Sequence, residues 1–340
     1  MKALDGNSLD VTTDQPANPV AETDRIAEVV LPSHLVEQDL SPFALFCSEG
    51  LDLYLLPGDR FAPYADAVGI LRELTYRQQL SGSGQSRDLD SRDPHYDHFL
   101  LVERSSGALA GSARLQFVPA SADPLPSGAQ SYLEHVYPGI KAQLASRGHH
   151  LEIGRVALAP RFQRLPHTLM CLFRGGLQVA VSSGYGSIHG LVSYNHFAYD
   201  DSLNRHFLSS LLRPPFLDPE QPRPQPRHPL SGLEAEPGES GSAGLGLAGA
   251  DLPAASSIQE LEQQIREQLN PAFRLPVLLR QYINLMEARV RNLSLARDFN
   301  QITEILMAAD LSRIQARRLS HFIDFAHTPV YRRFSWYRGG

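Results

Sequence analysis

Cysteine is scarce in this sequence, because its 340 residues include only Cys47 and Cys171. Two cysteines so far apart form neither a disulfide framework nor a CxxC metal site, which indicates a reducing compartment. His149 and His150 are neighbours, but no third ligand stands at a suitable spacing, so we expect a solvated turn and no metal site.

Long apolar runs are also missing. The longest candidate, residues 169–181, is interrupted by Arg174 and two glycines, and is too short to span a bilayer. The first residues lack the basic and apolar regions of a signal peptide, so we expect a cytoplasmic protein. The net charge of −6 gives no reason to expect nucleic acid as a partner.

Composition divides the chain into four parts. Residues 1–25 are polar without periodicity and predict a disordered tail, and residues 26–217 carry the main domain. Seven prolines between Pro214 and Pro229 precede a Gly-, Ala- and Ser-rich run, so residues 218–256 predict a disordered linker. Residues 257–340 predict a C-terminal helical segment that completes the domain.

Apolar spacing predicts helices over 64–80, 132–144, 167–183 and 199–212, and strands over 98–103, 111–118, 151–159 and 187–193. In the strand 151–159 the apolar residues change parity at Gly154 and Arg155, which a β-bulge would produce. After the linker, Ser257 and Glu260 form a capping-box pattern. The sequence then predicts a helix that begins near Pro276 and includes Val290. A strand over 303–307 and a helix over 312–325 come after it.

The unit 151–184 is the part most informative about chemistry. A helix that begins just after a strand offers free N–H groups and a positive dipole end to a phosphate, and Arg161 and Arg164 lie in the connecting loop. An ordinary strand–helix crossover with solvated arginines is the alternative. Asp90, Asp93 and Asp97 form an acidic loop that either attracts an ammonium group or is simply solvated.

Residues 151–160, LEIGRVALAP, resemble the Glu-Leu-Gly-Arg signature of the ornithine-lipid (hemolysin-like) N-acyltransferase family. Three further segments resemble that family in the same order: LRELTYR at 71–77, YDHFLLV at 96–102, and LPVLLRQY at 275–282 followed by Asp298-Phe299. That family has the GNAT fold and is similar in layout to the acyl-homoserine-lactone synthases. The resemblance covers roughly 70–215 and 270–325.

The resemblance implies an α/β fold of the GNAT type, with a central mixed sheet flanked by helices. It implies an N-acyltransferase that moves a long acyl chain, either plain or 3-hydroxylated, from acyl carrier protein to the amine of an amino acid such as ornithine. The product is a lyso-aminolipid. The phosphopantetheine thioester is then a donor substrate, and we expect no resident cofactor. Pro166 and Thr168 stand where CoA-dependent relatives have phosphate-loop glycines, which favours the carrier protein over CoA.

The site residues follow from the matching motifs. Glu152 is expected to bind the ammonium and accept its proton. Arg155 is expected either to orient Glu152 across the bulge or to bind a phosphate or acyl oxygen of the donor. The alternative is a buried structural ion pair. Donor binding is assigned to the residues of the strand and of the following loop and helix: Val156, Leu158, Arg161, Arg164 and Thr168. Acceptor binding is assigned to three charged residues: Arg77, Asp97 and Asp298.

Two other functions stay open. One is a signal synthase of the acyl-homoserine-lactone type. The other is a catalytically silent GNAT-fold protein that binds an acyl carrier, because Gln301 and Thr303 replace residues typical of the lipid-forming family. Residues 331–338 mix bases with aromatics, which suits either peripheral contact with a membrane or a frayed terminus.

Overall fold

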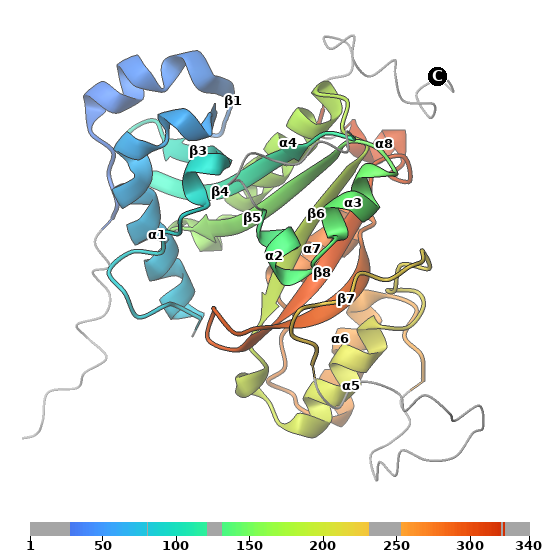
Figure 1. The fold of residues 1–340 in the computed structure, drawn as a ribbon. Coiled ribbons are helices and arrows are strands. Elements are labelled where there is room, and N and C mark those ends of the chain that lie inside the picture. Colours follow the sequence, from blue (N-terminus) through green and yellow to red (C-terminus); the bar gives the residue numbers. More distant parts are fainter. Residues whose placement is uncertain (1–27, 80, 121–130, 231–252, 321, 324–340) are drawn as a thin grey trace, which may run out of the picture.

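The computed structural model describes residues 28–79, 81–120, 131–230, 253–320, 322 and 323. One eight-stranded sheet organises this part of the chain, in the order β1-β2-β3-β4-β5-β6-β8-β7. Every neighbouring pair is antiparallel except β5–β6, which is parallel. The expected mixed sheet with flanking helices is confirmed (Figure 1). The predicted N-terminal tail and the aromatic segment 331–338 lie outside the described residues.

The strands are β1 (Ala44–Ser48), β2 (Leu51–Leu56), β3 (Asp97–Glu103), β4 (Leu109–Val118), β5 (His150–Leu158), β6 (Ser187–Tyr194), β7 (Arg289–Ala296) and β8 (Ile302–Asp310). The α-helices are α1 (Ala65–Gln78), α2 (Tyr132–Val136), α3 (Ile140–Ala145), α4 (Pro166–Ser182), α5 (Asp201–Leu211), α6 (Ile258–Gln268), α7 (Val277–Met286) and α8 (Ala316–Leu319). The predicted helix over 132–144 is therefore two helices, because Pro138 and Gly139, the latter at φ 84°, interrupt it.

Helices cover both faces of the sheet. On one face, α2 and α3 pack through Leu133 and Ile140 against Leu306 of β8 and Leu191 of β6. On the other face, Phe173 of α4 and Tyr282 of α7 stack edge to face, with ring centroids 5.1 Å apart. No helix among the described residues is long and apolar enough to cross a membrane.

The bulge predicted in β5 is confirmed. The β4–β5 register shifts between Ser112 and Arg114, and Arg155 has a φ of 51°. Gly154 pairs with Arg114, and Ala157 pairs with Ser112. The extra residue reverses which side chains face each side of the sheet, as the change of apolar parity requires.

The C-terminal segment is less helical than the sequence predicts. The helix α7 ends at Met286, where Glu287 adopts a left-handed conformation with φ 52°. Val290 therefore lies on strand β7 and not on a helix, and β7 and β8 enter the main sheet. The N-cap of the predicted capping box is confirmed, because the Ser257 hydroxyl accepts a hydrogen bond from the Glu260 N–H at 3.2 Å. The Glu260 carboxylate reaches back to the N–H of Ser256, at 2.7 Å, and not to that of Ser257.

Of the predicted disordered linker 218–256, residues 231–252 lie outside the described residues, whereas residues 218–230 are bound to the sheet. This irregular stretch follows the outer edge of β7: the Asp218 N–H donates to the Val290 carbonyl, and the Leu295 N–H donates to the His228 carbonyl, both at 2.8 Å. Glu220 binds Arg291, whose side chain is buried, at 2.7 Å. The segment thus protects a sheet edge, a role that its proline-rich composition does not reveal.

β5 and β6 pair only from His150–Ser187 to Ile153–Gly190, and β5 then continues to Leu158 and β6 to Tyr194. Their outer halves therefore diverge. A Cβ atom at Gly190 would lie 2.6 Å from the carbonyl oxygen of Ile153, so this last paired position requires glycine. Divergence at this point opens the sheet between two strands.

We predict that Gly190→Ala forces β5 and β6 apart and lowers the free energy of unfolding by about 1–3 kcal/mol, the usual cost of overpacking. Gly186→Ala is the matched control, because a Cβ there meets nothing within 4 Å. Chemical denaturation of both variants checks this. Equal stabilities would contradict the close approach.

Candidate active site

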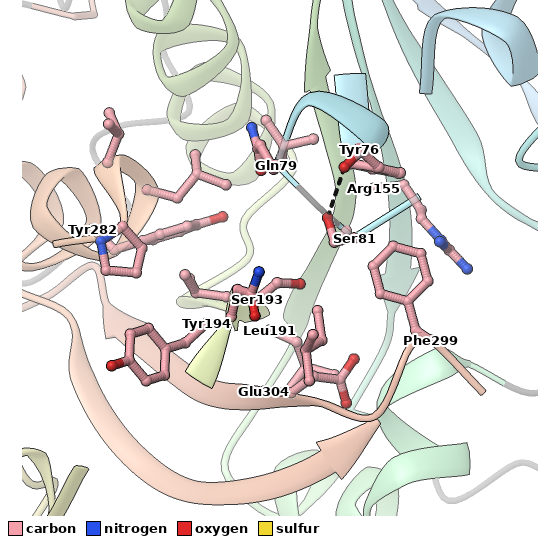
Figure 2. A pocket seen from close by; sticks show the side chains of 18 of the residues that line it. Tyr76, Gln79, Ser81, Arg155, Leu191, Ser193, Tyr194, Tyr282, Phe299 and Glu304 are labelled. Atoms are coloured by element: carbon pink, nitrogen blue, oxygen red, sulfur yellow. Dashed lines mark hydrogen bonds between the residues drawn. The ribbon is translucent and has the colours of Figure 1, made fainter. Parts of the chain in front are cut away.

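A cavity of about 650 Å³ lies where β5 and β6 diverge. Residues 153–156 of β5 and 191–195 at the end of β6 line it, together with the end of α1, the start of α7 and the residues around Phe299. Its size is that of a typical small-molecule site. Figure 2 shows Tyr282 toward one end of the cavity, and Arg155 and Phe299 toward the other.

Residues from both faces of the sheet line the cavity. Glu304 is two residues before Leu306 on β8, so it shares the face covered by α2 and α3. Tyr282 and Leu278 come from α7 on the opposite face. One end of the cavity is therefore charged and the other is largely apolar, and the gap between the strands connects them.

Glu152 lies where the sequence places it, on β5 and at the cavity, with only 3% of the residue exposed. Its Oε1 accepts hydrogen bonds from the Tyr96 hydroxyl at 2.6 Å and from the Leu133 N–H at 3.3 Å. Burial raises the pKa of Glu152, although these donors and Arg114 oppose the shift. The carboxyl group therefore holds the first turn of α2 against the sheet.

A second buried carboxyl group, Glu304, lines the same cavity and is 4% exposed. The Tyr132 hydroxyl donates to its Oε1 at 2.9 Å, and the Ser294 hydroxyl donates to its Oε2 at 3.3 Å. Burial raises the pKa of Glu304 to about 7, against the opposing effects of Tyr132 and Arg155. A carboxyl group that titrates near neutral pH is suited to receive a proton.

Arg155 lines the cavity from the bulge, but it does not orient Glu152 as expected. Its guanidinium binds Asp88 at 3.0 Å and lies 3.6 Å from Asp90. The ring of Phe299 lies 5.0 Å from the guanidinium carbon. The left-handed conformation at the bulge turns the side chain toward the loop before β3, which spacing along β5 alone does not predict.

The acidic loop is neutralised by arginines. Arg72 of α1 binds Asp93 at 2.8 Å, and Arg114 of β4 binds Asp90 at 2.9 Å and Asp93 at 3.1 Å. Although burial raises the pKa of Asp93, the two arginines outweigh it and hold that pKa far below its usual range. Asp90 and Asp93 are thus engaged within the protein and are not the groups that attract an acceptor.

The five residues expected to bind the donor lie in different places, and most of them are away from the cavity. Val156 lines the cavity, whereas Leu158 uses its carbonyl to accept from the Thr75 hydroxyl at 3.0 Å. Arg161 is paired with Glu103 and with Glu28, and Arg164 is exposed. Thr168 is fully buried at the start of α4, and its hydroxyl has no partner. Of these five residues, only Val156 borders the cavity.

The three expected acceptor-binding residues do not border the cavity either. Arg77 pairs with Glu73 at 2.7 Å one helical turn away. Asp97 accepts the Gly58 N–H at 3.1 Å, and the exposed Asp298 contacts His135 at 2.8 Å. Of the residues that the resemblance suggested, Glu152, Arg155 and Val156 therefore border the cavity, whereas Arg77, Asp97 and Asp298 make local contacts outside it.

Tyr132 and Glu304 are the residues that sequence reasoning missed. Tyr132 links the two carboxyl groups, because its N–H donates to the Tyr96 hydroxyl at 2.7 Å and its own hydroxyl binds Glu304. A charged residue within the apolar strand 302–310 was the available signal for Glu304. No group of three or more His, Cys, Asp or Glu residues in the described ranges is arranged to hold a metal ion.

The comparisons define the class of the protein. Residues 71–173 match the model of the acetyltransferase (GNAT) domain, a stretch that runs from α1 into α4 and includes Glu152 and Arg155. The fold is therefore of the GNAT type, and the protein is an acyltransferase enzyme of that type. No curated protein matches the chain in sequence.

Three solved structures are similar to the chain at low identity. An N-acyl amino acid synthase, FeeM, from uncultured soil microbes is 12% identical, with 80% of this chain and 98% of that one covered and a TM-score of 0.38. TofI in an apo form is 14% identical, with 81% and 98% covered and a TM-score of 0.38. The loading GNATL domain of CurA from Lyngbya majuscula is 12% identical, with 77% and 98% covered and a TM-score of 0.37. The class therefore rests on the family match.

We predict that Glu304→Gln stabilises the folded protein at alkaline pH. The folded pKa of about 7 exceeds the ordinary value of 4.5, so ionisation of Glu304 costs stability as pH rises through this window. Gln mimics the protonated form, so the gain should be near zero at pH 4, below the ordinary pKa, and reach about 3 kcal/mol at pH 8. Thermal denaturation across pH, with the exposed Glu37→Gln as control, measures it. A pH-independent difference would contradict the assignment.

Proposed function

We propose that this enzyme transfers a long acyl chain from a phosphopantetheine thioester to the amine of a small amino acid. One observation supports the amine acceptor above all. Glu152 and Glu304 border the cavity, yet no ion pair between described residues includes either carboxylate. The neighbouring arginines are instead paired with Asp88, Asp90 and Asp93.

An ammonium group would supply the missing cation. Buried charges need a partner, and neither of these two buried carboxyl groups has a cation within ion-pair distance. Arg274 also lines the cavity, but it is exposed and its guanidinium donates to the Pro271 and Phe273 carbonyls. An α-amino acid fits this arrangement, because its ammonium can approach the carboxylates while its carboxylate approaches Arg155. The resemblance to ornithine-lipid enzymes favours ornithine as this amino acid.

The divergence of β5 and β6 supports a thioester donor with an extended arm. In the strand pairings of the described residues, positions 154–157 of β5 and 191–194 of β6 have no strand partner on the edges that face each other. Free backbone donors and acceptors on such edges bind an extended chain with amide groups, as in strand addition. The pantetheine arm has this chemistry.

The apolar end of the cavity supports a long acyl chain. Val277, Leu278 and Tyr282 line it, and a second, small void of about 20 Å³ continues from it between the sheet and α4. That void has the volume of about one water molecule. Its lining by Leu169, Leu172 and Phe173 provides a surface that a hydrocarbon chain would follow if the helix moved slightly outward.

Acyl carrier protein fits the donor side better than CoA. Pro166 occupies the first position of α4, the Thr168 hydroxyl is buried, and Arg161 is already paired with two glutamates. Of the two arginines in the loop before α4, only the exposed Arg164 then remains for the phosphates of CoA. A carrier protein has a single phosphate and brings binding energy from its own surface. Because the product carries a long hydrocarbon chain, it would partition into a membrane, and the enzyme would release it most easily while bound to the membrane surface.

The acceptor is tested with purified enzyme and a long-chain acyl carrier protein. We predict that α-amino acids accept the chain at least 100-fold faster than the 2-hydroxy acids of the same skeleton, which lack the ammonium. Mass spectrometry of the products measures both reactions. Equal transfer to the hydroxy acids, or thioester hydrolysis with no acylated amine, would rule out the amine acceptor.

The donor is tested by comparing the carrier-protein thioester with the CoA thioester of the same chain. We predict a higher kcat/KM for the carrier protein. Because the carrier is acidic, we also expect this advantage to shrink as ionic strength rises. Equal use of the CoA thioester would show that the region around Pro166 does bind the larger set of phosphates.

A further inference from the structure

The two carboxyl groups at the cavity differ in what already binds them. We propose that Glu304, oriented by Tyr132, accepts the proton of the acceptor amine, and that Glu152 attracts the ammonium and anchors α2. This inference rests on the proposed acyl transfer to an amine. It assigns to β8 a catalytic residue that lies outside the segment matching the GNAT domain.

The position of Glu304 suits attack on a thioester in the gap between the strands. Glu304 pairs with Ser193 on β6, in the half of β6 that has no strand partner toward β5. A thioester beside this free edge would therefore be one strand away from the carboxylate. Glu304, Phe299 and Arg155 all line the cavity, and Figure 2 shows the Glu304 carboxylate below Phe299 and Arg155.

The hydrogen bonds of Glu304 leave it able to take a proton. Each oxygen accepts one hydroxyl, from Tyr132 and from Ser294, and a carboxylate has about four lone-pair sites. Both donors come from elements that are fixed by other contacts: α2 by Glu152, and β7 by its pairing with β8. The carboxylate is therefore oriented without being saturated.

Glu152 is bound differently. Its Oε1 carries the Tyr96 hydroxyl and the Leu133 N–H, and the Tyr96 hydroxyl in turn accepts the Tyr132 N–H. These bonds join β5, the start of β3 and the first turn of α2, so they place the Tyr132 ring. Tyr132 then delivers its hydroxyl to Glu304. Glu152 thus anchors α2, Tyr132 is positioned by that anchor, and Tyr132 in turn orients Glu304, the proton acceptor.

The charged and titratable groups that act on Glu304 come from three elements. Tyr132 of α2 and Arg155 of β5 favour the carboxylate, whereas Asp298, between β7 and β8, disfavours it. Together with burial they leave the pKa of Glu304 at about 7. Near neutral pH the group is thus ionised often enough to accept a proton and basic enough to hold it briefly.

The proposed reaction balances as follows. The ammonium gives one proton to Glu304, and the neutral nitrogen attacks the thioester carbonyl, forming the C–N bond. Collapse of the tetrahedral intermediate breaks the C–S bond, and the second proton of the nitrogen passes to the leaving thiolate. The products are an amide and a free thiol, and Glu304 then releases its proton to solvent.

The test compares Glu304→Gln, Glu152→Gln, Tyr132→Phe and the exposed control Glu37→Gln. For each, kcat and KM for the amine are measured from pH 6 to 9. For the wild-type enzyme and the control, we expect kcat to rise with pH around pH 7, as Glu304 becomes ionised. This rising part of the pH–activity profile is called the limb below. Glu304→Gln should lower kcat at pH 7 by roughly 100-fold or more, abolish this limb, and recover partly at high pH as free amine accumulates.

The other two variants separate positioning from chemistry. Glu152→Gln keeps the hydrogen-bond acceptor for Tyr96 and Leu133, so it should mainly raise KM for the amine and retain the limb. Tyr132→Phe removes a donor to ionised Glu304, so the limb should move to higher pH, which a purely structural role would not cause. If Glu304→Gln does not fold, Glu304→Asp takes its place, with a lower kcat and a displaced limb expected.

Three outcomes are decisive. A Glu304 variant with near-full kcat and an unchanged limb would overturn the assignment, while acyl transfer by the wild-type enzyme would still uphold the proposed function. Loss of the limb in Glu152→Gln alone would move the proton acceptor to Glu152. A wild-type enzyme that acylates no amine would instead refute the proposed function itself.

Discussion

The parallel pairing of β5 and β6 is the constraint on which the rest of the site depends. It holds over only four residue pairs and ends where Gly190 lets the two backbones come close. Beyond that point the sheet opens, and the cavity occupies the gap. Because β4 holds β5 and β8 holds β6 on their other sides, the sheet stays continuous although these two strands separate.

Buried charge explains how the polar side of this opening is kept in place. Arg72, Arg114 and Arg155 face Asp88, Asp90 and Asp93 in a region with little solvent. A fourth arginine, the partly exposed Arg92, lies 3.9 Å from Asp90. Burying such groups stabilises a protein only when nearly all of them are paired. The acidic loop is therefore best understood as the structural counterpart of arginines from α1, β4 and β5. It leaves Glu152 and Glu304 without a cation of their own.

Chemistry then divides between the two faces of the sheet. The face under α2 carries the carboxyl groups and the tyrosines that bind them, whereas α4 and α7 supply apolar side chains on the other face. A charged amine can therefore approach the gap from the polar face while a hydrocarbon chain lies along the apolar face. Neither substrate has to pass through the environment that suits the other. This division and the match to the GNAT domain together support the proposal that acyl transfer takes place in this cavity.

The sequence by itself determined the local elements and the bulge, because both depend on the spacing of apolar residues along one strand or helix. The parity change at Gly154 identified the bulge, and the resemblance around Glu152 identified the fold and the central carboxyl group. Only the tertiary structure decided which residues contact each other across the sheet and at the cavity. Arg155 turned to Asp88, residues 218–230 covered the edge of β7, and Glu304 came to the cavity from a strand some 150 residues after Glu152 in the sequence. Such contacts depend on sheet order and on which face each residue shares, and neither is encoded in the spacing of neighbouring residues.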